Sequence, residues 1–260
     1  SLLPASDSSV DIGSNGVRFA NIYGDTLYGD GSNLTGITSI TINSNADNRV
    51  ITGSGTANTL NGESSLLFDG SMLTVNGIRV GKGANAVAGN TALGLTALDA
   101  AVTGDNNTAI GKNTLSDNTS GQQNVAVGSQ ALEENTTGSN NTAVGHAALE
   151  NGTAGSNNTG IGMASLFNTT ASNNTAVGHN SLNANTTGTQ QVAVGGQALA
   201  NNTTGNFNQA FGYYALNANT TADYNTAVGY IALGSNTTGN FNTGLGRSTL
   251  NSNTTGVGNV

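Results

Sequence analysis

One pattern of polar and apolar positions repeats along most of the chain, and residues 141–145 (Asn-Thr-Ala-Val-Gly) show it in full. An amide residue begins the unit, an apolar residue stands fourth, and a glycine, which we call the key glycine, ends it. Successive key glycines are 17 residues apart, except Gly162 and Gly178, which are 16 apart. The key glycines are Gly94, Gly111, Gly128, Gly145, Gly162, Gly178, Gly195, Gly212, Gly229 and Gly246. A fixed period of this length predicts a solenoid with one turn per repeat.

Residues at equal distances from the key glycines are expected to stack into columns along the solenoid. An apolar residue always precedes the key glycine, Ala, Ser or Thr always stands three residues after it, and Leu always stands four after it. We expect these three columns to fill the interior. The apolar residues are Leu93, Ile110, Val127, Val144, Ile161, Val177, Val194, Phe211, Val228 and Leu245. The leucines are Leu98, Leu115, Leu132, Leu149, Leu166, Leu182, Leu199, Leu216, Leu233 and Leu250.

Two polar columns complete the repeat. Four residues before each key glycine stands Asn or Gln, from Asn90 to Asn242. Stacked amides of this kind hydrogen-bond along the axis of a fibre. The recurring Asn-Thr-Thr-Gly segment, as at residues 135–138, is predicted to form the outer turn, where its glycine relieves backbone strain.

Seventeen residues per turn leave room for one strong strand and one weaker strand. This predicts an all-β chain whose residues 81–260 form a narrow parallel β-roll of about ten turns, about 45–50 Å long at one strand spacing per turn.

The residues before the solenoid show shorter β patterns. Residues 1–38 alternate apolar and polar residues between Gly-rich turns, which predicts a short β-rich shaft segment. Residues 39–80 read as a β-rich connector, with strand candidates at 39–42, 50–52 and 66–68. Its end, residues 73–80, places Gly77 between two apolar runs, which predicts a hairpin or a bend.

The first segment resembles motifs of a known family. Residues 11–13 (Asp-Ile-Gly), 18–23 (Arg-Phe-Ala-Asn-Ile-Tyr) and 29–37 (Gly-Asp-Gly-Ser-Asn-Leu-Thr-Gly-Ile) are similar to motifs of long bacteriophage tail fibres. The resemblance implies an elongated, homotrimeric, β-rich fibre in the virion that attaches the phage to its host. Its partners would be other tail or baseplate proteins and a host surface polysaccharide or outer-membrane receptor.

The repeats resemble a second family. The unit at residues 141–145 is similar to the Asn-Ser-x-Ala-x-Gly unit in the heads of trimeric autotransporter adhesins, whose repeats are shorter than 17 residues. This resemblance implies a left-handed parallel β-roll and a trimer. It also leaves open an alternative function, that of an adhesin on a bacterial cell surface.

Composition favours assembly from several copies. The chain is 35% apolar and 8% charged, against typical values of about 45–50% and about 25%. One copy has too little large apolar surface for a wide core, so we expect oligomerisation. The chain begins without Met and stops at Val260 within a repeat, so we also expect it to be a segment of a longer protein.

Charge and residue usage exclude several functions. The formal net charge is −8, and no Lys or Arg stands between Lys112 and Arg247. Nucleic-acid binding is therefore not expected, because phosphates are bound mainly by these residues. No run approaches the roughly 20 apolar residues of a membrane helix. The lack of cysteine rules out disulfides and thiolate metal sites.

Aromatic residues mark the candidate receptor contacts. Phe207, Tyr224 and Phe241 stand five residues before successive key glycines, and Tyr213 and Tyr230 directly follow two of them. Arg247 ends the second set. Both sets are expected to form columns, which serve either as a saccharide-binding strip or simply as ladder packing between turns.

Other polar residues offer little chemistry. His146 and His179 share a column two turns apart, too far for one metal ion at the usual strand spacing. Glu133 and Glu150 share a column on adjacent turns, which matches the spacing of a glycosidase pair but lacks a neighbouring Arg, His or Trp. We therefore expect no catalytic, metal or cofactor site. A polysaccharide depolymerase, and an ice-binding solenoid suggested by the paired threonines, remain alternatives.

Overall fold

The computed structural model describes residues 49–53, 60–68, 72–100 and 102–260. The chain divides into two units, and the second, residues 44–52 and 61–260, contains nearly all of the described residues. The predicted shaft segment and the strand candidate at residues 39–42 lie outside the described residues.

In the described part of the chain, four strands precede the solenoid. They are β1 (Arg49–Gly53), β2 (Leu60–Phe68), β3 (Met72–Val75) and β4 (Ile78–Gly81). The predicted strands at 50–52 and 66–68 are confirmed by β1 and β2. Strands β3 and β4 form the predicted hairpin, whose turn residues Asn76 and Gly77 both have positive φ. Such a turn matches the twist of paired antiparallel strands.

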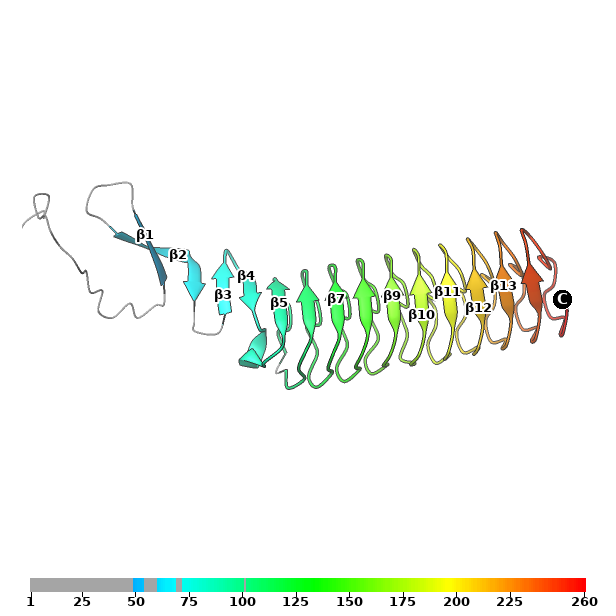
Figure 1. Ribbon diagram of the computed structural model, residues 1–260, viewed down its shortest axis with the longest axis horizontal. Helices are drawn as coiled ribbons and strands as arrows, with labels where there is room; N and C mark the ends of the chain where they lie inside the picture. The colour runs from blue at the N-terminus through cyan, green and yellow to red at the C-terminus, as the bar shows by residue number, and fades with distance from the viewer. Residues whose placement is uncertain (1–48, 54–59, 69–71, 101) are drawn as a thin grey trace, which may run out of the picture. The chain divides into compact units, whose positions relative to one another are not determined.

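Ten parallel strands, joined by nine turns, build the solenoid in the described part of the chain (Figure 1). A short 3-10 helix, η1 (Ala84–Ala86), leads into them from β4. The strands are β5 (Thr91–Gly94), β6 (Thr108–Ile110), β7 (Val125–Val127), β8 (Thr142–Val144), β9 (Thr159–Ile161), β10 (Thr175–Val177), β11 (Val192–Val194), β12 (Gln209–Phe211), β13 (Thr226–Val228) and β14 (Thr243–Leu245). Each strand pairs with the equivalent strand of the next turn, so the predicted parallel solenoid is confirmed.

The strand register survives the one short repeat. Thr159 pairs with Thr175 although these residues are only 16 apart. The missing residue falls in the loop around residues 169–171, where Thr169 replaces the usual Asn. A loop at the surface absorbs the deletion, and the sheet remains continuous.

The remainder of each turn contains no second strand in the described repeats. After Gly145, the backbone has positive φ at Ala147 and again at Leu149, so the chain turns twice within a few residues. Turn-to-turn hydrogen bonds still form there, for example from the amide of Leu149 to the carbonyl of Ser165 (3.0 Å). The predicted weaker strand is therefore wrong, because alternate residues in the left-handed region bend the chain out of an extended conformation.

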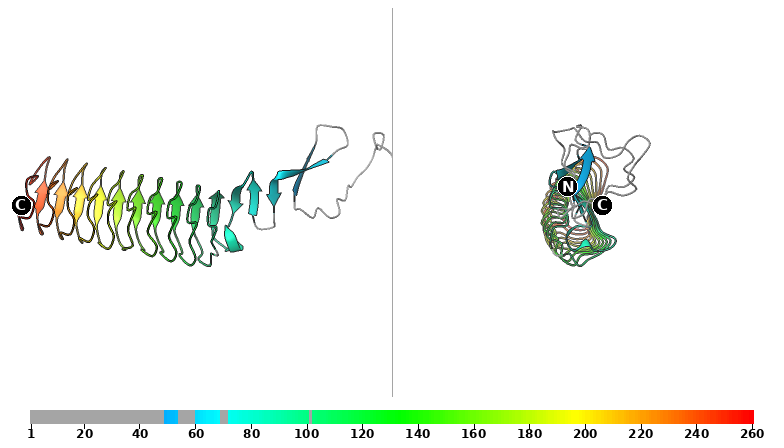
Figure 2. Two further views of the ribbon diagram at one scale, coloured as in Figure 1. Left: turned by 180° about the vertical axis from the view of Figure 1, so that it is seen from behind. Right: turned by 90° about the vertical axis from the view of Figure 1, so that its left-hand side faces the viewer.

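The core is a narrow line of small and aliphatic side chains between the strand and this bend. Nine successive leucines, from Leu98 to Leu233, are fully buried, as are the small residues that precede them, such as Ala131 and Ser165. These two predicted interior columns are confirmed. The end-on view in Figure 2 shows that successive turns superpose, which keeps each leucine above the equivalent leucine of the preceding turn.

Buried amides form two ladders inside the solenoid. In the first, which was predicted, the backbone amide of Asn141 donates to Asn124 Oδ1 (2.9 Å), and Asn141 Nδ2 donates to the carbonyl of Gly155 (2.8 Å). The second, which we call the Asn202 ladder, links amide side chains of successive outer turns directly. Its members are Asn118, Asn135, Asn185, Asn202, Asn219, Asn236 and Asn253.

The outer-turn glycine has a different role from the predicted one. Gly138 is not among the residues with positive φ, so it does not relieve strain. A Cβ atom there would lie 2.2 Å from the carbonyl oxygen of Gly155 and 2.4 Å from Asn135 Oδ1. Glycine is needed because the next turn and the amide ladder approach the backbone closely.

Candidate interaction surfaces

The apolar residue before each key glycine lies on the outer face of the sheet. Successive strand residues point to opposite faces, and the buried residue of each short strand is the middle one, as Ala143 and Ala176 show. The side chain of Ile161 is 39% exposed and that of Leu245 is 75% exposed. The prediction that this column fills the interior is therefore wrong.

The width of the turn explains why these side chains point outwards. A Cβ atom on Gly160 would lie 3.3 Å from Leu149 Cδ1, and one on Gly244 would lie 3.2 Å from Leu233 Cγ. The buried leucine thus packs directly against the middle strand residue, and the turn holds one large aliphatic side chain. Ala or Gly occupies the middle position of every solenoid strand from β6 to β14, and this signal identifies the inward-facing position.

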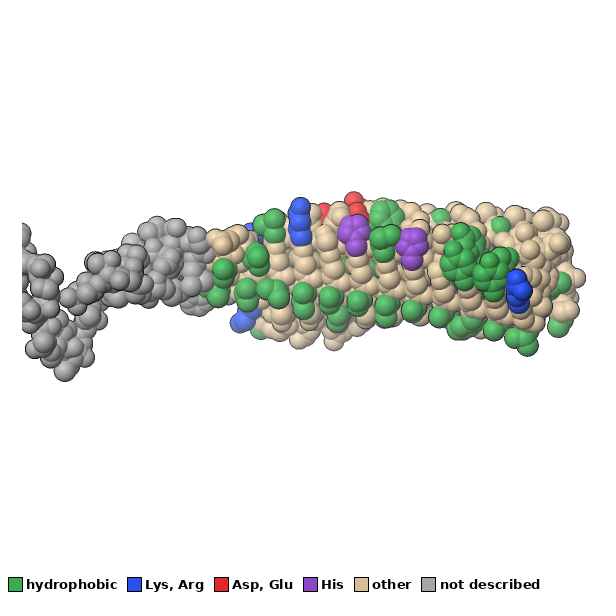
Figure 3. All heavy atoms as spheres, turned by 90° about the horizontal axis from the view of Figure 1, so that it is seen from above, with side chains coloured by type: hydrophobic (Ala, Val, Ile, Leu, Met, Phe, Trp, Pro, Cys, Tyr) green, Lys and Arg blue, Asp and Glu red, His purple; other side chains and the backbone are tan. Residues whose placement is uncertain are grey.

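The outward apolar side chains form a continuous row, which we call the apolar strip. It extends into the antiparallel strands, because Leu73 pairs with Val80 and Val80 with Leu93. The strip consists of Leu73, Val80, Leu93, Ile110, Val127, Val144, Ile161, Val177, Val194, Phe211, Val228 and Leu245. At one strand spacing per residue it is about 50 Å long. Figure 3 shows a row of hydrophobic side chains along the solenoid.

Threonines accompany the strip on the same face. The first residue of each strand points outwards like the third, and it is Thr in seven of the ten solenoid strands of the described chain. These residues are Thr91, Thr108, Thr142, Thr159, Thr175, Thr226 and Thr243. The outer-turn threonines, such as Thr136 and Thr137, lie in bends as predicted. The sheet face therefore presents a threonine column that sequence reasoning missed.

The first aromatic column, Phe207, Tyr224 and Phe241, lies at the corner just before the strands. The ring of Tyr224 stacks on Phe207 (centroids 4.8 Å apart, planes at 3°) and on Phe241 (5.1 Å, 6°). All three side chains are exposed. The two neighbours cover both faces of the Tyr224 ring, so its edge is what reaches solvent.

The second column, Tyr213, Tyr230 and Arg247, lies at the opposite corner, just after the strands. The two rings stack with centroids 6.0 Å apart, and the Arg247 guanidinium lies 5.8 Å from the centre of the Tyr230 ring. Tyr214 packs edge-on against Tyr213 (4.5 Å). Its hydrogen bond is the main reason that the pKa of the Tyr213 hydroxyl is raised. Both predicted columns thus form, and their role in receptor contact stays a prediction.

Histidine and glutamate do not assemble a metal site in the described chain. His146 and His179 are separated by the turn that carries Met163. Within residues 49–53, 60–68, 72–100 and 102–260, no three His, Cys, Asp or Glu side chains are grouped to hold a metal ion.

Glu133 and Glu150 do lie close enough to interact. Burial raises the pKa of Glu150, and the charge of Glu133 raises it further, while His146 opposes both effects. The expectation that no His lies near the pair is therefore wrong. Asn113 Nδ2 donates to Glu133 Oε1 (3.0 Å), and Oε2 of the same carboxylate is buried without a hydrogen-bond partner. A raised carboxyl pKa suits a general acid. Neither glutamate is among the residues that line the hollow described next.

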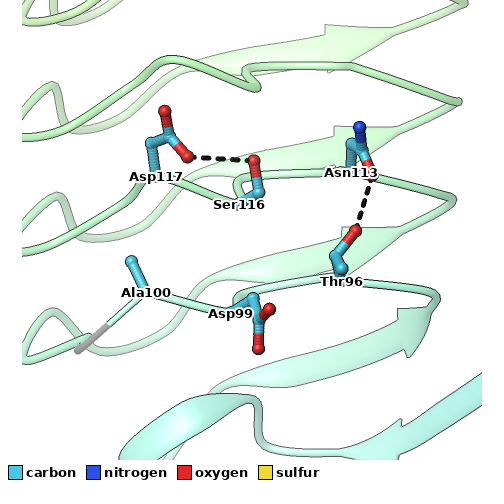
Figure 4. Close-up of a pocket in the computed structure, with 6 residues that line it drawn as sticks. All are labelled: Thr96, Asp99, Ala100, Asn113, Ser116 and Asp117. Atoms are coloured by element: carbon cyan, nitrogen blue, oxygen red, sulfur yellow. Dashed lines mark hydrogen bonds between the residues drawn. The ribbon is translucent and has the colours of Figure 1, made fainter.

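A shallow hollow between two turns is shown in Figure 4. Its lining is polar: Thr96 Oγ1 donates to Asn113 Oδ1 (2.6 Å), and Ser116 Oγ donates to Asp117 Oδ1 (3.2 Å). Asp99 at its rim forms an ion pair with Arg79. These side chains are already hydrogen-bonded to one another, so the hollow offers few free groups to a ligand.

The described part of the chain presents a long apolar strip flanked by aromatic corners. No family model, curated protein or solved structure matches this chain. Among the described residues, no helix has the length and apolar character needed to cross a bilayer. The function is therefore best inferred from what the sheet face and its two corners can bind.

Proposed function

We propose that this chain is a segment of a homotrimeric, non-enzymatic attachment fibre of the kind that bacteriophages carry on their tails. The observation that carries the proposal is the apolar strip. Monomeric soluble proteins rarely expose contiguous apolar patches larger than a few hundred Å². A strip about 50 Å long is instead what an elongated protein uses to pack against copies of itself.

The energetics favour assembly along the whole strip. Complete burial of a Val, Leu or Ile side chain contributes roughly 1.5–3 kcal/mol relative to exposure, so a half-exposed side chain contributes roughly 1 kcal/mol. Twelve such residues per chain provide on the order of 10 kcal/mol before the entropic costs of association. Burial of the strip in an oligomer also supplies the wide core that a single narrow turn lacks.

A parallel, in-register arrangement uses the strip best. All copies have the same 17-residue period, so aligned chains bring equivalent strands into one layer. In a trimer, three equivalent residues, such as three copies of Val144, meet around the axis in each layer. The choice of three copies follows the resemblance of the repeats to trimeric adhesin heads and of residues 11–37 to tail fibres.

The attachment role also follows from those resemblances. The fibre would join other tail or baseplate proteins and contact a host surface polysaccharide or outer-membrane receptor. The same assembly would serve a bacterial surface adhesin, which is the alternative location. The exposed aromatic side chains support a role in surface recognition, because aromatic residues are enriched at binding surfaces.

Light scattering on the purified chain tests the assembly. We expect a trimer, and we expect the double substitution Val144→Glu and Ile161→Glu to convert it to monomers, because six carboxylates would meet at the axis. The matched control is Thr137→Glu with Thr187→Glu, which adds the same charge at exposed outer turns and should remain trimeric. A monomeric wild type, or a trimeric strip variant, contradicts the proposal.

Binding to cells tests the attachment role. Fluorescently labelled protein is incubated with a panel of bacterial strains, before and after periodate oxidation of their surface glycans. We expect binding to a subset of strains, and its loss after oxidation if the receptor is a polysaccharide. Absence of binding to every strain contradicts an attachment function.

An ice-binding solenoid is the second candidate, and the threonine column on the sheet face favours it. Thr and Val side chains point outwards from the sheet in columns, with one strand spacing between turns. They therefore present methyl and hydroxyl groups in a repeating array. The two candidates use the same face, so they exclude each other for one assembly. Thermal hysteresis by a monomeric chain supports ice binding, and its absence removes the idea.

A further inference from the structure

The two aromatic columns begin in the same turn of the solenoid. Phe207 and Tyr213 flank β12, Tyr224 and Tyr230 flank β13, and Phe241 and Arg247 flank β14. In the preceding turns neither corner carries an aromatic residue. The first corner there holds Asn106, Gln123, Asn140, Asn157, Asn173 and Gln190. The second holds Lys112, Ser129, His146, Met163, His179 and Gly196.

The first corner is an unfavourable place for a bulky side chain. The backbone there has positive φ in every one of these turns: 56° at Phe207, and 58° at both Tyr224 and Phe241. Asn tolerates this region, whereas bulky residues rarely occupy it. An aromatic residue in three successive turns at such a position indicates a compensating contact.

Stacking within the column supplies part of that contact, but the three rings remain exposed in one chain. The two corners are six residues apart on either side of a three-residue strand, so they lie at most about 20 Å apart. The aromatic contacts of the described residues link members of the same column or the adjacent Tyr213 and Tyr214. Within the described part of one chain, the two columns therefore do not contact each other.

Threefold symmetry brings the two corners together. When the apolar strips of three copies face a common axis, their strands lie along the sides of a triangle. Because all three strands run in the same rotational sense, the end of one strand meets the beginning of the next. Every corner of the triangle then combines the second corner of one copy with the first corner of its neighbour.

We propose that, in the trimer, the first aromatic column of one copy packs against the second aromatic column of its neighbour. These contacts would hold together the last three turns of the three copies. This inference rests on the proposed trimer and identifies the residues that touch. In register, Phe207 meets the neighbour's Tyr213, Tyr224 meets its Tyr230, and Phe241 meets its Arg247. The third pair is a cation–π contact, which suits the one layer where the tyrosine is replaced by arginine.

Ring geometry favours a protein occupant over a sugar. A saccharide stacks on the face of an aromatic ring, but both faces of Tyr224 are covered by Phe207 and Phe241. The exposed edges can still bury apolar surface against the side chains of a neighbouring copy.

Disulfide trapping tests the contact, since the chain has no cysteine of its own. In the double variant Tyr224→Cys with Tyr230→Cys, oxidation should link each copy to the next and close a covalent ring. We expect a band at three times the chain mass on non-reducing gels. Either single variant should stay uncross-linked, because its three copies occupy three separate corners.

Light scattering on the same samples separates the possible failures. Monomers before oxidation overturn the proposed trimer itself. A trimer without cross-links overturns only the corner contact. As a second measurement, Tyr224→Asn with Tyr230→Ser restores the residues of earlier turns and should lower the melting temperature of the trimer. If this variant instead loses cell binding at unchanged trimer stability, the columns are receptor contacts and the inference fails.

Discussion

At the scale of single residues, the pKa of the Glu150 carboxyl is affected by the acidic side chains around it. Burial and the neighbouring Glu133 raise its pKa, so the folded state binds its proton more tightly than the unfolded state. The stability from this group is fully present below the unfolded pKa and is lost as the pH rises through the folded value. At pH 7 the ionised Glu150 therefore destabilises the fold.

The substitution Glu150→Gln should raise the melting temperature slightly at pH 7 and leave it unchanged near pH 3, where both residues are neutral. Thermal unfolding followed by circular dichroism at the two pH values measures this difference. Asp117→Asn is the control, because it removes a carboxylate from an exposed position on another turn. An equal effect of Glu150→Gln at both pH values contradicts the explanation.

Single residues also show where sequence reasoning stops. The leucine columns were predictable because a large aliphatic residue recurs without exception. Their backbone conformation was not: Leu149 has a φ of 55°, in a region that costs an L residue roughly 1–2 kcal/mol. Leucine carries no propensity for that region, and only its burial and the close spacing of the turns hold it there.

At the scale of elements, the Asn202 ladder stabilises the outer turns. Asn202 is buried; its Nδ2 donates to Asn185 Oδ1 (3.1 Å) and to the carbonyl of Gly205 (3.1 Å), and its Oδ1 accepts from Asn219 (2.7 Å). Asn202→Ala removes these bonds and should cost about 1–3 kcal/mol of unfolding free energy, measured by denaturant titration. The exposed neighbour Asn201 is the control, and a similar cost for Asn201→Ala would refute a specific role for the ladder.

A break in this ladder supports the same interpretation. One turn after Asn135, the equivalent position is occupied by Gly152, which has no side-chain amide to donate. Asn135 Oδ1 is accordingly buried without a hydrogen-bond partner. Elsewhere the Oδ1 atoms of ladder members such as Asn202 and Asn219 accept a bond from the next turn.

The strands show what a period can and cannot predict. The spacing of the key glycines predicted parallel pairing between equivalent positions, and Thr142 indeed pairs with Val125 and Thr159. The spacing did not decide which residues of a three-residue strand point inwards, because Val144 is apolar and Thr142 is compatible with either face. The invariably small middle residue carried that information, since only Ala or Gly fits against the buried leucine.

At the scale of the whole molecule, the sequence placed the corner residues in columns. It did not show where each column lies relative to the outward-facing apolar strip. Tyr224 and Tyr230 were predicted to stack with residues of their own columns, and they do. Their position at opposite ends of one outward-facing strand follows only once the apolar strip is known to point outwards. The two aromatic columns then flank the proposed interface.

The modular construction of the solenoid leads to a last prediction. Each turn contacts chiefly its neighbours, so stability is approximately a sum over turns and the interfaces between them. Deletion of residues 129–145 removes 17 residues and joins Gly128 to His146, which leaves every column in register. We expect the shortened chain to fold with the same circular dichroism per residue and to lose roughly a tenth of its unfolding free energy.

A deletion of residues 129–136 is the matched control. It removes fewer residues but also Ala131, Leu132 and Asn135, and it shifts every later residue of that turn out of its column. The buried leucine and the ladder amide are then missing from one layer, so both the core and the hydrogen bonds on either side lose their partners. The smaller deletion should therefore be the more damaging, with a lower melting temperature and a less cooperative transition. If the two deletions destabilise the chain equally, register along the columns is not what holds the solenoid together.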